Sequence, residues 1–377
     1  MTSTLLAGAF CLFCLAARLP VGVGLQDVFV SSCSDLSVLA DAIQEDDVNA
    51  TVVNNLSCDD EWTTVVVPSN RKLRVEAEKP TWRVKFTNIR FVVEARETSG
   101  DWDCTFAINS KFFSTIDADS GLAIQDVNGG VLNVGEGATV LFEGFTRCVG
   151  VSIVSARNDG DFSDHLVFGG CWYNEGTIRV EDQAIFNDND NSGGGESFPG
   201  NGGAVFNGAS ASIEFGGGIE AKRNVCYDDF GGRGGAIYNE GSIVVSKSAV
   251  FSRNLAEAGG AIYNDQNATF NFETEDTVSF WNNRQLDNNG GHVYNSGSMK
   301  FDSYVKMLRG NTIFTNGLME FSGGALLKRI SEGAVFASDG WDFGDTLPLI
   351  TFKNNEANSA GCEDLYYFSD GEFLCGP

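Results

Sequence analysis

The sequence predicts an all-β protein, a single right-handed parallel β-helix with a short capping helix near its N-terminus. Three observations predict it: a glycine-rich repeat, short apolar runs between the repeats, and the overall composition. The chain has 377 residues, of which 45 are Gly and 42% are hydrophobic. Glycine without a triplet period excludes collagen, and the hydrophobic fraction excludes a disordered chain. Many short strands joined by tight turns fit this composition.

A two-part repeat runs through the C-terminal half. Gly-Gly pairs followed by a short apolar run begin at positions 169, 202, 234, 259, 290 and 323, so successive copies start 33, 32, 25, 31 and 33 residues apart. The motif F-x-x-N begins at positions 186, 251, 280 and 352. Such a period is typical of a solenoid in which each repeat forms one coil. We predict one continuous solenoid over about 61–361, in which Phe251 stacks near Phe280 and Ile237 near Ile262 and Val293.

Asparagine recurs at the end of the Gly-Gly element, and stacking would place these residues above one another. We expect their amides to form a hydrogen-bonded ladder that satisfies the polar groups of a tight turn. The Gly pairs would supply positive φ at a corner and permit close approach of adjacent coils. The ladder residues are Asn174, Asn207, Asn239, Asn264 and Asn295.

The two ends of the solenoid need covers, because they would otherwise expose core and sheet edges. Residues 25–60 are expected to form an N-terminal cap with a helix at about 35–43, N-capped by Ser34 or Asp35. This helix would bury Leu36, Leu39, Ala40 and Ile43 on one face. Residues 362–377 would form the C-terminal cap. Closeness in sequence favours the disulfides Cys33–Cys58 and Cys362–Cys375.

The first 24 residues resemble a secretory signal peptide, although they lack a basic residue before the apolar core Leu5 to Ala17. That core is short for a membrane span, and no second long apolar run follows, so no span is expected in the mature chain. Eight cysteines remain after the signal, an even number that fits an oxidising compartment. We predict a secreted or cell-surface protein, with Asn49, Asn55 and Asn267 as glycosylation sequons.

The chain is strongly acidic, with 51 Asp and Glu against 25 Lys and Arg, a net charge of −26. Such a surface disfavours nucleic acid as a partner. A solvated acidic exterior and Ca²⁺ binding both fit the charge; Asp188 and Asp190 are the candidate Ca²⁺ ligands. The chain has only two histidines, His165 and His292, and no C-x-x-C pair after the signal, so a zinc site is not expected. No cofactor is expected either.

The paired motifs resemble the repeats of chlamydial polymorphic outer membrane proteins, which are pectin-lyase-like right-handed β-helices. The resemblance covers about 169–355 and is most specific over 234–264, where Gly-Gly-Ala-Ile-Tyr-Asn occurs twice with Phe251-x-x-Asn254 between the copies. It implies a passenger-like region used in adhesion. Because the sequence ends at Pro377, we expect no translocator barrel of the kind those proteins carry.

Three functions follow as expectations. The first is non-catalytic adhesion to an extracellular polysaccharide or a surface protein, with Trp172, Trp281 and Trp341 as the aromatic side chains that would stack on sugars or else pack in the core. The second is a polysaccharide lyase or glycoside hydrolase, for which Asp164 with His165 and Asp228 with Asp229 are weak candidates, because no catalytic signature of such enzymes accompanies them. The third is a structural component of a cell wall or mucilage. The oligomeric state stays open.

Overall fold

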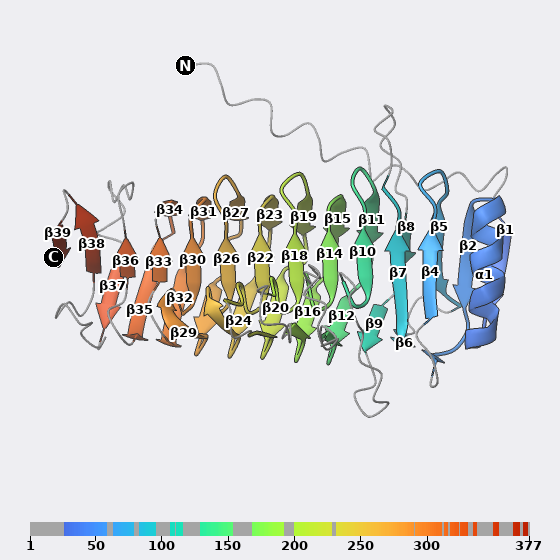
Figure 1. Ribbon diagram of the computed structural model, residues 1–377, viewed down its shortest axis with the longest axis horizontal. Coiled ribbons are helices and arrows are strands. Elements are labelled where there is room, and N and C mark those ends of the chain that lie inside the picture. Colours follow the sequence, from blue (N-terminus) through green and yellow to red (C-terminus); the bar gives the residue numbers. More distant parts are fainter. Residues whose placement is uncertain are drawn as a thin grey trace, which may run out of the picture.

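The computed structural model describes seventeen segments of the chain, and all structural statements below concern them. They are 26–58, 63–78, 83–95, 106–109, 111–115, 129–153, 168–191, 200–227, 231–289, 291–310, 313–315, 317–323, 325–330, 335–337, 350–353, 365–369 and 372–375. The predicted signal peptide lies outside them. The described chain is mostly strand with one helix, and it winds in coils stacked along the long axis of the molecule (Figure 1).

Two sheets of eleven strands form two faces of the coils. The first contains β1 (Gln26–Val30), β2 (Val48–Val52), β5 (Leu73–Ala77), β8 (Phe106–Asn109), β11 (Thr139–Phe142), β15 (Thr177–Val180), β19 (Ser212–Phe215), β23 (Ser242–Val245), β27 (Thr269–Phe272), β31 (Ser298–Phe301) and β34 (Leu318–Phe321). The second contains β3 (Leu56–Ser57), β6 (Arg83–Thr87), β9 (Lys111–Thr115), β12 (Thr146–Val149), β16 (Ala184–Asn187), β20 (Ile219–Lys222), β24 (Ala249–Ser252), β28 (Val278–Trp281), β32 (Val305–Gly310), β35 (Ala325–Ile330) and β37 (Ile350–Lys353).

A sheet of twelve strands and a short one of five complete the coils. The large one contains β4 (Thr63–Val67), β7 (Ile89–Val93), β10 (Leu132–Val134), β14 (Trp172–Asn174), β18 (Val205–Asn207), β22 (Ile237–Asn239), β26 (Ile262–Asn264), β30 (Val293–Asn295), β33 (Ile313–Thr315), β36 (Val335–Ala337), β38 (Leu365–Ser369) and β39 (Glu372–Cys375). The short one contains β13 (Ser152–Ile153), β17 (Asp190–Asn191), β21 (Val225–Cys226), β25 (Leu255–Ala258) and β29 (Arg284–Asn289).

Strand pairing follows the repeat of the sequence. Within these sheets each strand pairs in parallel with its equivalent in the next coil, and the described exception is the antiparallel pair β38–β39. Ile237 pairs with Ile262, and Ile262 with Val293, the register that the Gly-Gly repeat predicts. The sequence analysis places the first coil at about residue 61, but β1 and β2 already belong to the first eleven-stranded sheet. The stacked parallel sheets are the arrangement of a β solenoid.

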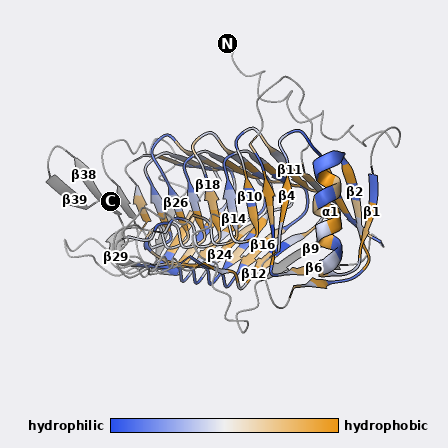
Figure 2. Ribbon diagram, turned by 45° about the vertical axis from the view of Figure 1, so that its right-hand side comes forward, coloured by the Kyte–Doolittle hydropathy of each residue, from blue (hydrophilic) through white to orange (hydrophobic). Residues whose placement is uncertain are grey.

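The interior of the coils is apolar and aromatic. Figure 2 shows hydrophobic colour on the strands and hydrophilic colour on the turns that join them. Alternate side chains of each strand face inward, so like residues from successive coils meet. Phe251 and Phe280 stack with ring centroids 5.1 Å apart, as the F-x-x-N repeat predicts. Phe272 stacks on Phe301 at 4.7 Å in the same way. The core is therefore one continuous apolar column along the axis.

The glycine pairs that begin at positions 169, 202, 234 and 259 act at the corner before the twelve-stranded sheet, whereas the pair that begins at Gly323 precedes β35 of the second eleven-stranded sheet and is not their equivalent. Gly234 has φ +69°, a backbone conformation that costs glycine little. A Cβ on Gly235 would lie 2.1 Å from the carbonyl oxygen of Gly260 in the next coil. The first glycine thus supplies the turn, and the second permits close approach of the coils.

Helix α1 (Cys33–Glu45) is longer than predicted and begins two residues earlier than the predicted 35–43. Its N-cap is Ser32, whose backbone N–H donates to the Asp35 carboxylate (3.0 Å). Leu36, Leu39 and Ile43 are buried as predicted, while Ala42 takes the place expected for Ala40, which is half-buried. The helix lies at the N-terminal end of the molecule and packs against β1, β2 and β4 (Figure 1).

Two disulfides tie coils together. Cys33–Cys58 is present as predicted and links α1 to the residue after β3. Cys148–Cys171, which the sequence analysis does not predict, joins β12 to the residue before β14. Cys375 ends β39, but Cys362 lies outside the described residues, and so does the predicted bond between them. In the described part of the chain, no helix is long and apolar enough to cross a bilayer.

Candidate binding surface at a corner of the coils

Each of the predicted sugar-stacking tryptophans has a different place. Trp172 is fully buried, stacked on Phe142 at 5.0 Å and edge-on to Phe186 at 4.7 Å. Side chains alternate along β14, so that Trp172 faces inward and Tyr173 faces outward. Trp172 therefore packs in the core and cannot stack on a sugar. Trp281 is half-buried at the C-terminal end of β28, and the Arg253 guanidinium carbon lies 4.7 Å from the centroid of its ring. Trp341 lies outside the described residues.

The predicted catalytic and metal residues gather no site in the described residues. Asp164, His165, Asp228 and Asp229 lie outside them. The carboxylate of Asp188 accepts hydrogen bonds from Arg223, at 2.7 Å from Nη2. No group of three or more His, Cys, Asp or Glu side chains within the described segments could hold a metal ion, so no third side chain of these types joins Asp188 and Asp190 there.

The five predicted ladder asparagines are in register and fully buried. Asn174 donates to Asn207 (2.8 Å), and Asn207 to Asn239 (2.8 Å). The series continues through Asn264 and Asn295 at 2.7 and 2.8 Å and ends on the Thr315 hydroxyl at 3.1 Å. These amides are saturated inside the fold and offer nothing to a ligand.

A column of stacked aromatic side chains covers the outer face of the twelve-stranded sheet. Its rings lie 4.5 to 5.5 Å apart and nearly parallel. Burial raises the pKa of the Tyr238 phenol, which stays protonated and donates to the Asp265 carboxylate (2.9 Å). The ring faces are covered by their neighbours, so a sugar cannot stack on them. The members are Tyr173, Phe206, Tyr238, Tyr263, Tyr294 and Phe314.

A second line of side chains runs along the corner where the second eleven-stranded sheet meets the five-stranded one. In five successive coils one residue near the end of the strand adopts the left-handed conformation, with φ between 51° and 58°; it directly follows the strand in the first four coils and lies within β32 in the fifth. We call this line the corner row: Asp188, Arg223, Arg253, Asn282 and Arg309. The backbone N–H groups of Asp188, Arg223, Arg253 and Asn282 bond to carbonyls of the next coil, as Arg223 does to Ser252 (3.0 Å) and Arg253 to Trp281 (3.0 Å). The row thus advances by one inter-strand spacing, about 4.8 Å, per coil.

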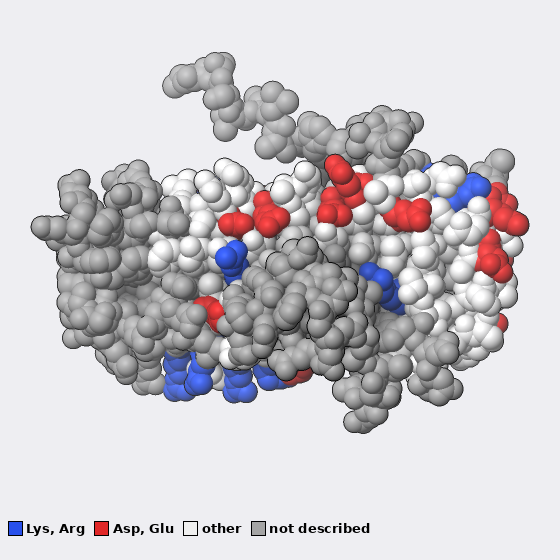
Figure 3. Space-filling view, viewed as in Figure 1, with Lys and Arg blue, Asp and Glu red and all other residues white. Residues whose placement is uncertain are grey.

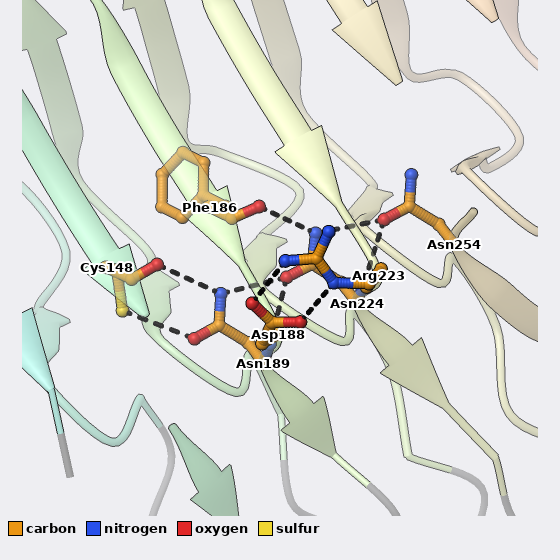
Figure 4. Close-up of polar contacts among 7 residues, drawn as sticks. All are labelled: Cys148, Phe186, Asp188, Asn189, Arg223, Asn224 and Asn254. Carbon is orange, nitrogen blue, oxygen red and sulfur yellow. Dashed lines mark hydrogen bonds and ion pairs between the residues drawn. The ribbon is translucent and has the colours of Figure 1, made fainter. Parts of the chain in front are cut away.

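A buried asparagine ladder lies directly beneath the corner row. It consists of Asn189, Asn224, Asn254 and Asn283, and we call it the inner ladder. The Asn254 Oδ1 accepts from both the backbone N–H (2.9 Å) and the amide (3.0 Å) of Asn224. Asn224 in turn donates to the carbonyl of Phe186 (2.9 Å). Figure 4 shows the part of this network from Asn189 to Asn254, together with the Asp188–Arg223 pair. The ladder fixes the backbone that carries the row.

The inner ladder ends at His292. The next residue in the series is Gly310, and a Cβ there would lie 2.7 Å from the His292 ring. The imidazole fills this place, with its Nδ1 3.2 Å from the Asn283 amide nitrogen. Burial lowers the pKa of His292 from 6.5 to about 3, so the ring is neutral at physiological pH.

The corner row is basic on an acidic protein. Asp188 carries the one negative charge in the row, and Arg223 carries its partner charge. Arg253 and Arg309 have no ion-pair partner in the described part of the chain, and all three arginines are exposed. Figure 3 shows Lys and Arg side chains at the lower edge of the molecule and most of the visible Asp and Glu side chains along the upper part. The guanidinium groups in this line can each bind an anionic group through paired N–H donors.

The sequence analysis missed this surface, although a pattern marks it. The residue before each inner-ladder asparagine is a corner-row residue, so Arg-Asn occurs at 223–224 and 253–254 within the repeat. Reading F-x-x-N only for its Phe and Asn hides the residue directly before the Asn. The composition also concealed it, since 25 basic residues are outnumbered by 51 acidic ones.

The three sequons differ in exposure. Asn55 and Asn267 are exposed. Asn49 is half-buried in β2, and its amide donates to the Asp27 carboxylate (3.1 Å). A glycan on Asn49 would have to replace one of that amide's hydrogens.

Comparison with known proteins identifies no relative of this chain. No family model, no curated protein and no solved structure matches it.

Proposed function

We propose that the chain is an exported, non-catalytic right-handed parallel β-helix of the pectin-lyase-like kind, which adheres to an extracellular polysaccharide along the corner row. The observation that carries the proposal is the row itself: one left-handed residue per coil, exposed at Asp188, Arg223, Arg253 and Arg309 and half-buried at Asn282, repeated along the axis. An extended polymer presents its own repeat along a line. A surface that repeats at one coil spacing can therefore meet successive units.

The row is preorganised for binding. Coil-to-coil backbone bonds hold Asp188, Arg223, Arg253 and Asn282 in place, and an inner-ladder asparagine follows each of them, so binding orders only the side chains of these four residues. Trp281 adds an apolar ring beside the cation of Arg253. An aromatic ring edged by hydrogen-bond donors suits a sugar, which has apolar C–H faces and polar rims.

Two further features support export and a closed N-terminal end. Disulfides form and persist in oxidising compartments, and the described chain contains two. We infer that α1 caps the solenoid, because its buried face covers β1, β2 and β4 at the end where the core would otherwise meet water.

The proposal is tested by co-sedimentation of the purified chain with a panel of insoluble and soluble polysaccharides, neutral and charged, with parallel assay of new reducing ends and unsaturated products. We expect binding without product. Trp281→Ala should weaken the binding about tenfold, through loss of the ring and of the support it gives Arg253. Phe29→Ala, which removes an aromatic ring that is 69% exposed on β1, is the matched control and should leave affinity unchanged. Accumulating product, or no binding to any polymer, contradicts the proposal.

A further inference from the structure

We infer that the ligand of the corner row is a polyanion, a polysaccharide bearing carboxylate or sulfate groups, and that Arg253 and Arg309 are its principal contacts. This inference rests on the proposed function and names the class of polysaccharide. Three independent observations carry it: the backbone conformation of the row, the spacing of its charges, and the lack of an ion-pair partner for Arg253 and Arg309 among the described residues.

The backbone does not favour arginine at these positions. Six successive coils place a residue in the left-handed region at this corner: Gly150, Asp188, Arg223, Arg253, Asn282 and Arg309, with φ of 68°, 58°, 54°, 58°, 53° and 51°. Glycine, Asn and Asp are the residues that adopt this region at low cost, and three coils use them. Arginine gains no local hydrogen bond from this conformation and is strained in it. Arg223 is paired with Asp188 and Arg253 lies over the Trp281 ring, whereas Arg309 has neither contact among the described residues. We attribute the two arginines that lack an ion pair, Arg253 and Arg309, to a ligand outside the fold.

The charge arrangement is also unfavourable for the isolated protein. Arg223 and Arg253 occupy adjacent coils, about 4.8 Å apart along the axis, where like charges repel. Asp188 compensates Arg223 from the other side. No carboxylate compensates Arg253 or Arg309 within the described segments, although acids outnumber bases twofold in the chain. The repulsion between neighbouring arginines and the lack of a counter-charge are both relieved when an anionic group of a ligand bridges the guanidinium groups.

The spacing fits a linear polymer with regularly placed anions. Arg253 and Arg309 are two coils apart, about 10 Å, with Asn282 between them as a neutral donor and acceptor. Guanidinium groups bind carboxylates and sulfates through paired N–H donors. A single glycan chain is narrow enough to contact the corner row alone. Double-stranded nucleic acid, with a phosphate charge about every 1.7 Å, would bring a far denser charge against the acidic remainder of the surface.

Matched polymers and matched variants test the inference. Dextran against dextran sulfate, and methyl-esterified against de-esterified polygalacturonate, differ only in charge. We expect at least tenfold tighter binding to the charged member of each pair, weakening as salt rises. Arg253→Asn and Arg309→Asn install the residue that occupies the equivalent position 282, so both should fold and melt no lower than wild type. Each should lose about tenfold in affinity for the charged polymers.

Arg179→Asn is the charge-matched control, because it removes an arginine from the outer face of β15, paired with Glu214 at 3.7 Å, and should not alter binding. Equal binding of neutral and charged polymers, unaffected by Arg253→Asn, overturns this inference and leaves the proposed function standing. Binding to no polymer defeats the proposed function itself. Tighter binding of a single-stranded oligonucleotide than of any glycan would assign the row to nucleic acid and overturn the inference.

Discussion

At the residue scale, the residue type that suits a buried position depends on the side chain stacked on it in the neighbouring coil. Asn283 finds no asparagine above it, and His292 takes the place of the alanine that the repeat supplies at 236 and 261. The substitution completes the inner ladder with an imidazole nitrogen. Its cost is a buried Nε2 atom that has no hydrogen-bond partner among the described residues. A titratable group therefore lies in the core, directly beneath the corner row.

His292 should make the protein acid-sensitive. Its pKa is about 3 in the folded chain, against an ordinary 6.5, because burial penalises the charged ring. The unfolded chain takes up the proton below pH 6.5 while the folded chain does not, so this site destabilises the fold as pH falls from 6.5 towards 3, by about 1.4 kcal/mol per pH unit. Urea unfolding of wild type and His292→Gln at pH 7.0 to 4.5 measures it. The wild-type free energy of unfolding should fall relative to the variant by about 2–3 kcal/mol. Parallel curves would refute the assignment.

At the element scale, the strands are short, and their registry depends on polar ladders as well as on the apolar core. Strands of three or four residues, such as β22 and β24, make few backbone bonds each. The ladders give every corner a second set of bonds in a buried environment, where an unpaired polar group is costly. Stacked rings, such as Phe251 on Phe280, fix the same registry from the inside.

Removing one inner-ladder side chain should therefore cost more than its own hydrogen bonds. Asn254→Ala leaves the backbone N–H and the amide of Asn224 without their acceptor, and the Ala221 carbonyl without its donor (3.0 Å). We expect a loss of about 3 kcal/mol or more in unfolding free energy, since each buried unsatisfied group costs roughly 1–3 kcal/mol. Asn271→Ala, on the outward half-buried side of β27, is the control and should change stability by less than about 0.5 kcal/mol. A small effect of Asn254→Ala would show that the ladder is dispensable.

At the scale of the whole molecule, the coils form a one-dimensional stack with two ends and continuous side rows. Each coil contacts only its neighbours, so a property repeated per coil becomes a line on the surface. The corner row, the aromatic column and the apolar core are three such lines. The ends are different, because there a sheet edge and the core face solvent unless another element covers them.

Opening the N-terminal end should cause self-association. Leu39 is buried on the face of α1 that packs on the first strands, and Leu39→Asp should displace the helix and expose the edge of β1 and the core beside it. Light scattering after size-exclusion chromatography should then detect higher oligomers. Val38→Asp is the matched control, because Val38 is 57% exposed on the same helix, and it should leave the size distribution unchanged. Unaltered size for Leu39→Asp would argue against the capping role.

The apolar spacing near the N-terminus determined the amphipathic helix, and closeness in sequence determined the Cys33–Cys58 bond. The repeat by itself determined the stacked parallel coils and the register of Ile237 with Ile262 and Val293. These follow from sequence because a period puts like residues above one another whatever the details of the turns. The tertiary structure alone decided that Trp172 faces the core, that Cys148 meets Cys171, and that Arg223, Arg253 and Arg309 align on one left-handed corner. Strand facing changes with a shift of one residue, and a corner conformation depends on the coils above and below, so neither can be derived from a local pattern.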